Sequence, residues 1–441
     1  MADVERVMAI YFINRFFYPD HAATSQILSD LAFALAARGH EIHIITSRLR
    51  YDDASQRLRA AETIKGVHVH RIWSTGFGRG RLAGRFIDYA TFYASLVFSL
   101  LKHVRRADVV VAKTDPPMLS VIAGPLCRLR RAVAVNWLQD IFPEVVLASP
   151  ERAAWWKRAG FNILAALRTR SCRLAATNVV LGARMAERVK SWAPTIETTV
   201  IANWAVGEEV RPVPASANGL RKDWGLERAF VIGYSGNLGR AHEMATFVQA
   251  FDALHQRFGQ TSKVTLPDGR TLQALFIGGG ALYEALRAHV EVQGPTWVRF
   301  EPYMPREALA ESLSVPDVHL VSLRPELEGL IVPSKIYGIA AAGRAAVFVG
   351  DPDGEVARLL KAGDAGLTVA PGDGEGLAEA LLALARDSER TAQMGVNARA
   401  MFDDAFDVGH AIAAWEQLLA RLGAPAPDAA LHRLPASRDS L

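Results

Sequence analysis

A strand, a helix and a second strand follow one another directly at the start of the chain. Residues 7–13 form a continuous apolar run, as expected of a strand that is buried on both faces. Apolar residues then recur at helical spacing over 25–37, and residues 41–46 form the next apolar strand. Because this order makes a βαβ unit, the segment predicts a parallel sheet with right-handed crossovers.

The same alternation continues through the chain and starts again after a break. Further strands are expected at 66–72, 108–112, 132–137, 178–182, 199–204, 230–235, 275–280, 318–321 and 346–349. The break at 206–221 is rich in Pro, Ser, Asn and Gly, which indicates a linker. We therefore predict an α/β fold with two Rossmann-like domains, at 1–205 and 222–402.

Composition supports two ordinary domains. The chain has 441 residues, of which 50% are hydrophobic and 22% charged, enough for two separate cores. Cys127 and Cys172 form no CxxC pair and accompany no histidine cluster, so neither a disulfide framework nor a structural zinc site is expected. The start of the chain at 3–6 is unlike a signal peptide, which predicts a cytoplasmic protein.

Basic residues crowd the first half of a chain whose net charge is only +4. Such a surface suits an anionic membrane or nucleic acid, and we expect a membrane surface and no nucleic acid. Residues 86–101 form an apolar helix flanked by arginine-rich groups, and its 16 residues are fewer than the roughly 20 that span a bilayer. Either this helix lies on the membrane or it packs in the core, and the flanking arginines favour the membrane. A second basic helix at 155–173 has the same two interpretations.

A strand, a glycine-containing turn and a helix start also occur together at 318–343. Ser334 is expected to cap the helix, so that the first amides of the helix point into the turn, and Lys335 adds a positive charge beside them. The alternative is that Lys335 and Glu328 are solvated loop charges. Because ligands bind at the carboxyl ends of strands in such sheets, the pattern favours a phosphate-bearing ligand.

A second turn of this kind follows the strand that opens the second domain. Gly236 and Asn237 are placed in the turn, and Arg240 and His242 near the start of the next helix. An arginine at a helix N-terminus is unfavourable unless an anion is bound, so Arg240 favours a phosphate site.

These residues carry a resemblance to a known family. Glu328 and Gly329, the segment 333–337 and the segment 340–344 resemble the donor-site signature of glycosyltransferase family 4, in the branch that makes bacterial exopolysaccharide and lipopolysaccharide. The resemblance implies that Glu328 grips the donor hexose. The family's second carboxylate, which holds the ribose, would fall on Gly338.

The resemblance also assigns the diphosphate contacts and the acceptor side. The family's usual Arg and Lys correspond here to Asn237 and His242, so Arg240 and Lys335 are expected to neutralise the diphosphate. Acceptor contacts are expected in the first domain, at His21, Ala22, Ala23 and Asp115. Asp140 either orients the acceptor hydroxyl and takes its proton, or caps the helix that begins near Pro143.

The resemblance implies a GT-B architecture, with two Rossmann-like domains facing each other across a cleft and a helix at 403–423 returning toward the first domain. The residues at 424–441 are expected to be a disordered tail. The implied activity is a retaining transfer from a nucleotide-diphosphate sugar to a lipid-linked acceptor, by a cytoplasmic enzyme peripheral on the inner membrane. No cofactor or metal is expected, and the DxD at 351–353 is interpreted as a turn. Two alternatives stay open: a nucleotide-sugar epimerase of the same architecture and a noncatalytic nucleotide-sugar-binding protein.

Overall fold

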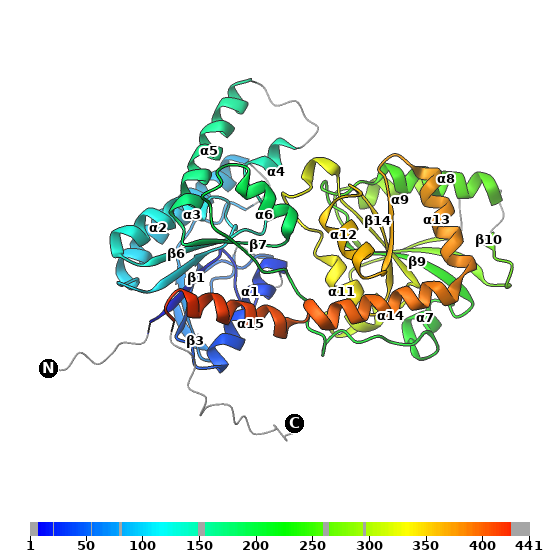
Figure 1. The fold of residues 1–441 in the computed structure, drawn as a ribbon, viewed down its shortest axis with the longest axis horizontal. Helices are drawn as coiled ribbons and strands as arrows, with labels where there is room; N and C mark the ends of the chain where they lie inside the picture. The colour runs from blue at the N-terminus through cyan, green and yellow to red at the C-terminus, as the bar shows by residue number, and fades with distance from the viewer. Residues whose placement is uncertain are drawn as a thin grey trace, which may run out of the picture. The chain divides into compact units, whose positions relative to one another are not determined.

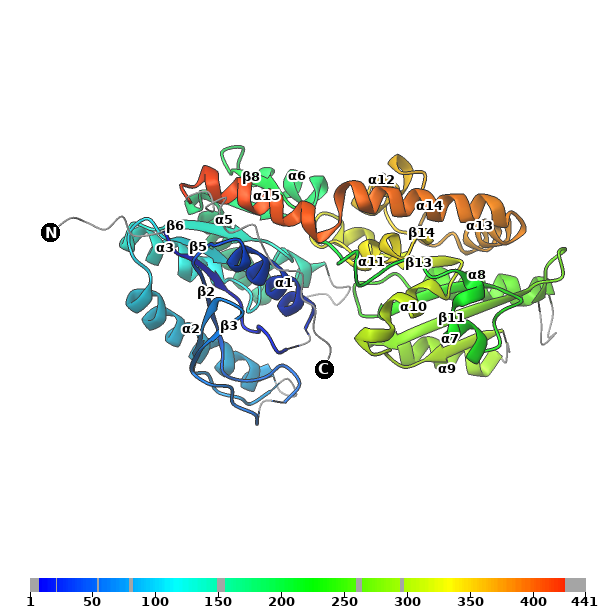
Figure 2. The same cartoon turned by 90° about the horizontal axis from the view of Figure 1, so that it is seen from below.

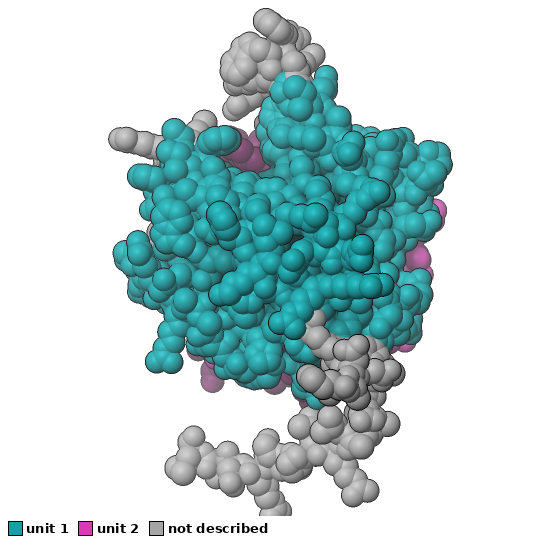
Figure 3. Space-filling view, turned by 90° about the vertical axis from the view of Figure 1, so that its left-hand side faces the viewer, with its two compact units in different colours: residues 1–181, 185–201, 411–441 teal, residues 182–184, 202–410 magenta. Residues whose placement is uncertain are grey.

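The computed structural model describes residues 8–20, 22–53, 55–78, 82–148, 155–258, 264–293 and 297–424. The chain forms two compact units, drawn as ribbons in Figure 1 and in separate colours in Figure 3. Unit 1 takes its described residues from 1–181, 185–201 and 411–441, and unit 2 from 182–184 and 202–410. Each unit is built around a largely parallel sheet covered by helices, which confirms the predicted α/β class.

Unit 1 is organised around a sheet of short buried strands. They are β1 (Ile10–Ile13), β2 (Ile42–Ser47), β3 (Ala61–Ile64), β4 (Val67–Ile72), β5 (Val109–Ala112), β6 (Val133–Trp137), β7 (Thr177–Val180) and β8 (Thr198–Val200). Their order is β3-β4-β2-β1-β5-β6-β7-β8, with β3 antiparallel to β4 and the other neighbours parallel. Every residue of β1, β5 and β7 is buried, which explains why their sequences are continuously apolar.

Helices cover both faces of this sheet. They are α1 (Ala23–Ala37), α2 (Leu82–His103), α3 (Leu119–Arg130), α4 (Glu144–Leu147), α5 (Trp155–Leu174), α6 (Ala183–Lys190) and α15 (Val408–Arg421). Side chains alternate across a strand, so Tyr11 and Ile13 face α2 and α3, whereas Phe12 faces α15. Figure 2 shows α2 and α15 on opposite sides of the strands.

Helix α2 is longer than the predicted segment 86–101. Its residues Phe92 and Leu96 are fully buried in the unit 1 core, whereas Phe86 and Phe98 are each 75% exposed. The core-helix interpretation is therefore correct for one face of α2. Among the helices of the described ranges, none is both long and apolar enough to cross a membrane.

The helix that ends the described chain packs on unit 1. Trp415 of α15 is fully buried, with its ring 4.8 Å from that of Trp137 and 5.8 Å from that of Phe12. Arg38 of α1 donates to Glu416 of the same helix at 3.1 Å. The helix begins at Val408 rather than at residue 403, because residues up to Ala405 belong to the preceding helix.

Unit 2 repeats the architecture. Its strands are β9 (Ala229–Asn237), β10 (Val264–Thr265), β11 (Thr271–Gly279), β12 (Val298–Glu301), β13 (Val318–Ser322), β14 (Ala345–Val349) and β15 (Gly366–Val369). Their order is β10-β11-β9-β13-β14-β15, and β12 pairs with β11. Among the strand pairs that the described residues of unit 2 form, only the pair of β10 with β11 is antiparallel.

The unit 2 helices and short 3-10 turns complete the layers. The helices are α7 (Gly219–Asp223), α8 (Ala245–Phe258), α9 (Tyr283–Gln293), α10 (Leu309–Ser314), α11 (Lys335–Ala341), α12 (Glu355–Ala362), α13 (Gly374–Arg386) and α14 (Ser388–Ala405), and the 3-10 turns are 215–217, 306–308 and 325–327. Residues Phe230 and Ile232 of β9 face one core, and Ala229 and Val231 face the other. A strand buried on both faces in this way again explains its continuous apolar run.

The segment predicted as a linker lies against unit 2. Arg399 donates to the carbonyl of Val210 at 3.0 Å, and Arg344 donates to the carbonyl of Val213 at 2.8 Å. Asn218 caps α7 by accepting a hydrogen bond from Arg221 N at 2.9 Å. Two hydrogen bonds from arginine side chains and one helix cap thus satisfy backbone polar groups of this segment.

Candidate active site

The carboxyl ends of β9 and β11 approach each other through glycines. Gly236 and Gly278 are paired across the two strands, and both have left-handed backbone angles, with φ of +114° and +135°. A Cβ on Gly278 would lie 2.3 Å from the carbonyl oxygen of Gly236, so a larger residue cannot be accommodated there. The glycines keep this edge of the sheet free of side chains, so that a ligand can approach the backbone.

Lys335 lies beside this edge at the first residue of α11. Its Nζ atom donates to the hydroxyl of Tyr234 and lies 3.7 Å from the centre of the same ring. Tyr234 belongs to β9 and is fully buried. Burial lowers the pKa of Lys335 well below its ordinary value. An anion placed against this group would favour its charged form, because an opposite charge raises a lysine pKa.

His242 lies on the other side of Tyr234 and is uncharged at neutral pH. Burial, followed by the nearby charge of Lys335, lowers the pKa of His242 to about 4. Its Nδ1 atom is 2.8 Å from the carbonyl oxygen of Ser322, so that nitrogen carries the proton and donates. The neighbouring Asn237 is exposed at the end of β9. Neither residue therefore supplies a positive charge at this edge.

Arg240 does not begin a helix, contrary to the prediction. It is exposed in a turn, and α8 begins five residues later, at Ala245. The carboxylate of Glu243 accepts from the amide N atoms of Ala245 and Thr246, at 3.1 and 3.0 Å. The helix start is thus capped by a side chain of the protein, because the turn is longer than the sequence pattern indicated.

Ser334 occupies the predicted N-cap position of α11, but its side chain does not cap the helix. Its backbone is helical, with φ −60° and ψ −16°, and its side chain accepts no capping hydrogen bond. The amides of Ile336 and Tyr337 instead donate to the carbonyls of Pro333 and Ser334, each at 3.2 Å. The exposed Ser334 hydroxyl is therefore not used by the helix.

Glu328 is held by the start of another helix. Its Oε1 atom accepts from the amide of Glu355, the first residue of α12, at 2.9 Å. A Cβ on Gly354 would lie 2.5 Å from Oε2, so a glycine is needed beside this carboxylate. Burial raises the pKa of Glu328, although the α12 amide opposes this shift. The following residue, Gly329, adopts φ +72° and is buried, which fixes the loop that carries Glu328.

The structure also shows the surroundings of Gly338 and of the DxD at 351–353. Gly338 packs toward α10, where an added Cβ would be 3.4 Å from Leu313. Asp351 accepts from the amide of Asp353 at 2.9 Å, which confirms that this DxD forms a turn. Across the described ranges, no group of three or more His, Cys, Asp or Glu side chains is arranged to hold a metal ion.

In unit 1, polar residues gather where β5 and β6 end. Lys113 follows β5 directly and is 1% exposed. Its Nζ atom donates to the carbonyl of Thr24 at 2.8 Å and lies 4.1 Å from the centre of the Trp137 ring. Burial lowers the pKa of Lys113 to about 7, although the carboxylates of Asp115 and Asp140 oppose this shift. The prediction omitted Lys113, although a charged residue directly after a buried strand was a usable signal.

Asp140 shares this environment. The residue keeps contact with solvent, but the surrounding protein desolvates its carboxyl group. This desolvation, reinforced by the charge of Asp115, raises the pKa of Asp140 to about 6, and Lys113 opposes the shift. Asp140 does not cap α4, because the residue at that position is Pro143 and no side chain caps the helix. Asp140 and Lys113 line a small cavity of about 20 Å³, enough for roughly one water molecule. A carboxyl group with a pKa near neutrality is suited to proton transfer.

The remaining acceptor residues lie at the start of α1. Ala22 precedes the helix with extended backbone angles and no side-chain cap, and Ala23 is its exposed first residue. His21 lies outside the described residues. Arg168 was counted among the basic surface residues, but it is 5% exposed and pairs with Glu144.

Protein-family models match the sequence of both units. A model described as a glycosyl transferase 4-like domain matches residues 23–204, and a model of glycosyl transferases group 1 matches residues 229–387. The chain belongs to the family 4-like glycosyltransferases. The predicted family is therefore confirmed, and the enzyme is a glycosyl-transferring transferase of class EC 2.4.

Named relatives of this glycosyltransferase are found in bacteria. It is 28% identical over 308 residues to the probable glycosyltransferase WbjE of Pseudomonas aeruginosa, over 68% of this chain and 72% of that protein. It is 22% identical over 362 residues to the putative colanic acid biosynthesis glycosyl transferase WcaI of Escherichia coli K12, over 80% and 85% of the two chains.

Solved structures share the fold. Sucrose-phosphate synthase of Thermosynechococcus elongatus has a TM-score of 0.71 at 17% identity, over 94% of this chain and 99% of its own. HepE of Anabaena, solved in complex with UDP and glucose, has a TM-score of 0.67 at 18% identity, over 94% and 100%. The likeness establishes the predicted GT-B fold.

Proposed function

We propose that this glycosyltransferase is a retaining enzyme that moves a sugar from a nucleotide-diphosphate sugar, bound by unit 2, to a hydroxyl of a lipid-linked saccharide, bound by unit 1. The observation that carries the proposal is Lys335, whose ammonium group is held against Tyr234 beside the glycine-lined edge of the second sheet. The solved complex of the structural neighbour HepE with UDP and glucose supports a nucleotide sugar as the donor.

The donor side of the mechanism follows from charge. When the bond between the anomeric carbon and the diphosphate oxygen breaks, its electron pair stays on the diphosphate, where negative charge develops. Lys335 would offset this charge, together with Arg240 and the amides of the turn that follows Gly236. Glu328, fixed by the start of α12, would accept hydrogen bonds from the hexose hydroxyls and orient the anomeric carbon. We propose that these groups suffice without a metal ion or cofactor.

The acceptor side requires removal of a proton. The acceptor oxygen forms a new bond to the anomeric carbon on the face that the diphosphate leaves, and its proton passes to Asp140. The raised pKa of Asp140, about 6, suits this role near neutral pH. Asp115 would position the acceptor, with Ala22 and Ala23 leaving space beside α1. Ser334, Asn237 and His242 would supply uncharged donor contacts.

The proposal predicts sugar transfer that depends on a lipid fraction. The purified protein is incubated with a panel of nucleotide sugars, with and without bacterial membrane lipids, and both nucleoside diphosphate and glycolipid are measured. We expect one donor to release nucleoside diphosphate in step with glycolipid formation. Conversion of the nucleotide sugar in the absence of lipid would instead support an epimerase, and binding without turnover would support a noncatalytic protein. Family membership favours transfer over both.

A surface of unit 1 that is both apolar and basic supports a lipid-linked acceptor. Helix α3 contacts both α2 and α5, and each of the three carries an exposed apolar side chain. These are Phe98 at 75%, Leu129 at 69% and Ile163 at 64%. Exposed basic residues on or next to the same helices are Arg105, Arg106, Arg128, Arg131, Arg170 and Arg173. Apolar and basic side chains together favour an anionic membrane surface.

We therefore expect the protein to sediment with phosphatidylserine vesicles and not with phosphatidylcholine vesicles, and to be released at about 0.5 M salt. Phe98→Ser is expected to weaken this binding, because it removes an exposed ring from α2. The matched control is Val396→Ser in unit 2, where the side chain is 62% exposed. Equal sedimentation with both vesicle types would contradict a preference for anionic lipid, and failure to sediment with either would contradict a peripheral membrane location.

A further inference from the structure

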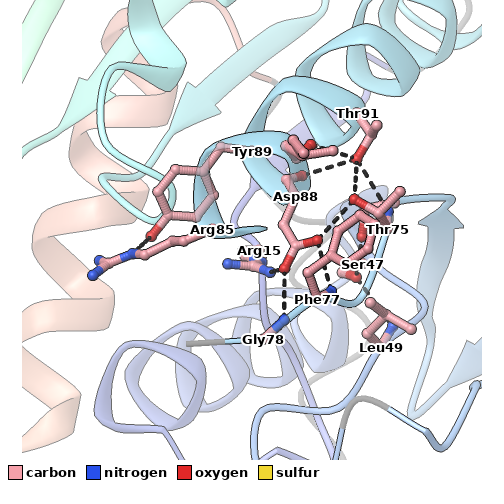
Figure 4. A network of polar contacts seen from close by, with 12 residues as sticks. Arg15, Ser47, Leu49, Thr75, Phe77, Gly78, Arg85, Asp88, Tyr89 and Thr91 are labelled. Carbon is pink, nitrogen blue, oxygen red and sulfur yellow. Dashed lines mark hydrogen bonds and ion pairs between the residues drawn. The ribbon is translucent and has the colours of Figure 1, made fainter. Parts of the chain in front are cut away.

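Two arginines of unit 1 flank one tyrosine ring. The Cζ atom of Arg15 lies 5.0 Å from the centre of the Tyr89 ring, and that of Arg85 lies 5.5 Å from the same centre. Arg85 also donates from Nε to the Tyr89 hydroxyl at 3.0 Å. We refer to Arg15, Arg85 and Tyr89 as the arginine clamp. Figure 4 shows both guanidinium groups on the same side of Asp88.

The backbone of Arg15 fixes the clamp at the ligand-binding edge of the sheet. Its amide donates to the carbonyl of Asp115 at 2.6 Å, just beyond β5. Its carbonyl accepts from Thr46 Oγ1 and from Ser47 N, each at 2.9 Å, at the end of β2. Arg15 therefore lies at the carboxyl ends of the parallel strands, next to the proposed acceptor residue Asp115.

Asp88 faces the clamp but does not use up its hydrogen-bond donors. It is 1% exposed, and its carboxylate accepts from Thr75 Oγ1, Phe77 N and Gly78 N at 2.7, 3.0 and 3.1 Å. The closest approach of Arg15 to Asp88 is 3.8 Å, which is an ion pair without a hydrogen bond. The carboxylate thus orients Arg15 while it bonds mainly to the loop, as Figure 4 shows.

One donor of Arg15 is left without a partner. Its Nε atom is buried and has no hydrogen-bond acceptor among the described residues. Buried N–H groups are nearly always paired, so an unpaired guanidinium donor at a ligand-binding edge indicates that a ligand supplies the acceptor. Stacking on the rings of Phe16 and Tyr89 holds the guanidinium plane in place.

We propose that the arginine clamp binds a phosphoryl group carried by the acceptor. The inference rests on the proposed function, because it specifies which part of a lipid-linked acceptor unit 1 recognises. Guanidinium groups bind phosphate through two parallel hydrogen bonds, and the several oxygens of one phosphoryl group can engage two arginines at once. Asp88 pairs with Arg15 at 3.8 Å and is already bonded to the loop at 75–78, and Asp115 contacts Arg15 through its backbone carbonyl.

The test measures binding of farnesyl diphosphate to the full-length protein by titration calorimetry, with farnesol and inorganic pyrophosphate as probes that each lack one part. We expect the dissociation constant for farnesyl diphosphate to rise about tenfold for Arg15→Gln and for Arg85→Gln. Arg15→Lys is expected to restore only part of the affinity, because lysine keeps the charge but loses the planar fork. The matched control is Arg188→Gln, which removes an exposed arginine of α6 outside the proposed membrane surface and is expected to leave the dissociation constant unchanged.

Thermal unfolding shows whether Arg15→Gln stays folded, and the exposed Arg85 provides a second variant that does not depend on packing.

Binding of pyrophosphate alone that depends on the two arginines would support the phosphoryl contact and would show that the diphosphate, rather than the isoprenoid chain, provides the affinity. The proposal is overturned if both glutamine variants bind farnesyl diphosphate as the wild type does, or if the wild type does not bind it. It is equally overturned if glucuronic acid binds in its place, which would indicate a carboxylate site. If the wild-type protein binds farnesyl diphosphate through the two arginines but transfers no sugar, the proposed function is rejected and the phosphoryl site is retained.

Discussion

Replacing Lys335 by methionine is expected to lower the rate of sugar transfer by about a thousandfold, because a cation that stabilises a leaving group contributes two to three orders of magnitude. Methionine preserves much of the apolar contact with Tyr234, so the variant should fold. The measurement is nucleoside diphosphate release with saturating donor and acceptor. The matched control is Lys361→Met, which removes an exposed lysine of α12 and should leave the rate unchanged.

Proton uptake provides a second readout of the same residue. Because burial lowers the pKa of Lys335 and a bound diphosphate should raise it, diphosphate binding is expected to be linked to proton uptake at pH values near or above the lowered pKa. Calorimetric titration of nucleoside diphosphate in buffers of different ionisation enthalpy should detect the proton for the wild type and not for Lys335→Met. A wild-type rate in Lys335→Met would remove this lysine from the mechanism.

Asp140→Asn is expected to lower transfer by about a hundredfold, since positioned proton acceptors contribute two to four orders of magnitude. The pKa of Asp140 is raised to about 6, so its carboxylate form, which is the base, is lost as the pH falls through that value. The wild-type rate should therefore rise with pH through about 6, and Asp140→Asn should abolish this dependence. The measurement is the rate of transfer as a function of pH.

Lys113 should set the position of this pH dependence. The charge of Lys113 lowers the pKa of Asp140, so Lys113→Met should shift the rise in rate to higher pH, by about one unit. Asp52→Asn removes an exposed carboxylate of unit 1 and is the matched control, with an unchanged profile expected. A profile that keeps its rise near pH 6 in Asp140→Asn would assign the titration to another group.

The sequence located the donor edge better than it described its geometry. Lys335 was predicted from a strand, turn and helix in order, and the structure places it at the first residue of α11. Its partner Tyr234 was read only as part of an apolar strand, because nothing local indicates that a strand tyrosine meets a lysine about a hundred positions away. Arg240 was misplaced because Glu243, three residues later, supplies the helix cap.

The acceptor side depends more strongly on distant contacts. Asp140 and Asp115 were predicted from their positions after strands, whereas the buried Lys113 between them was overlooked. The arginine clamp joins Arg15, which follows β1, to two residues of α2, and no sequence spacing relates them. Arg168 appeared to be a surface charge, and its burial with Glu144 depends on how α5 packs.

The sequence by itself determined the α/β class and the central parallel strands of both sheets, because strands covered on both faces must be continuously apolar and crossover helices must show helical spacing. It did not predict the edge strands β3, β10, β12 and β15. The tertiary structure alone decided which polar groups meet at the sheet edges, how deeply they are buried and which hydrogen bonds they keep. Burial sets the pKa of Lys335, and burial together with neighbouring charge sets the pKa values of Lys113 and Asp140; both effects are properties of three-dimensional packing.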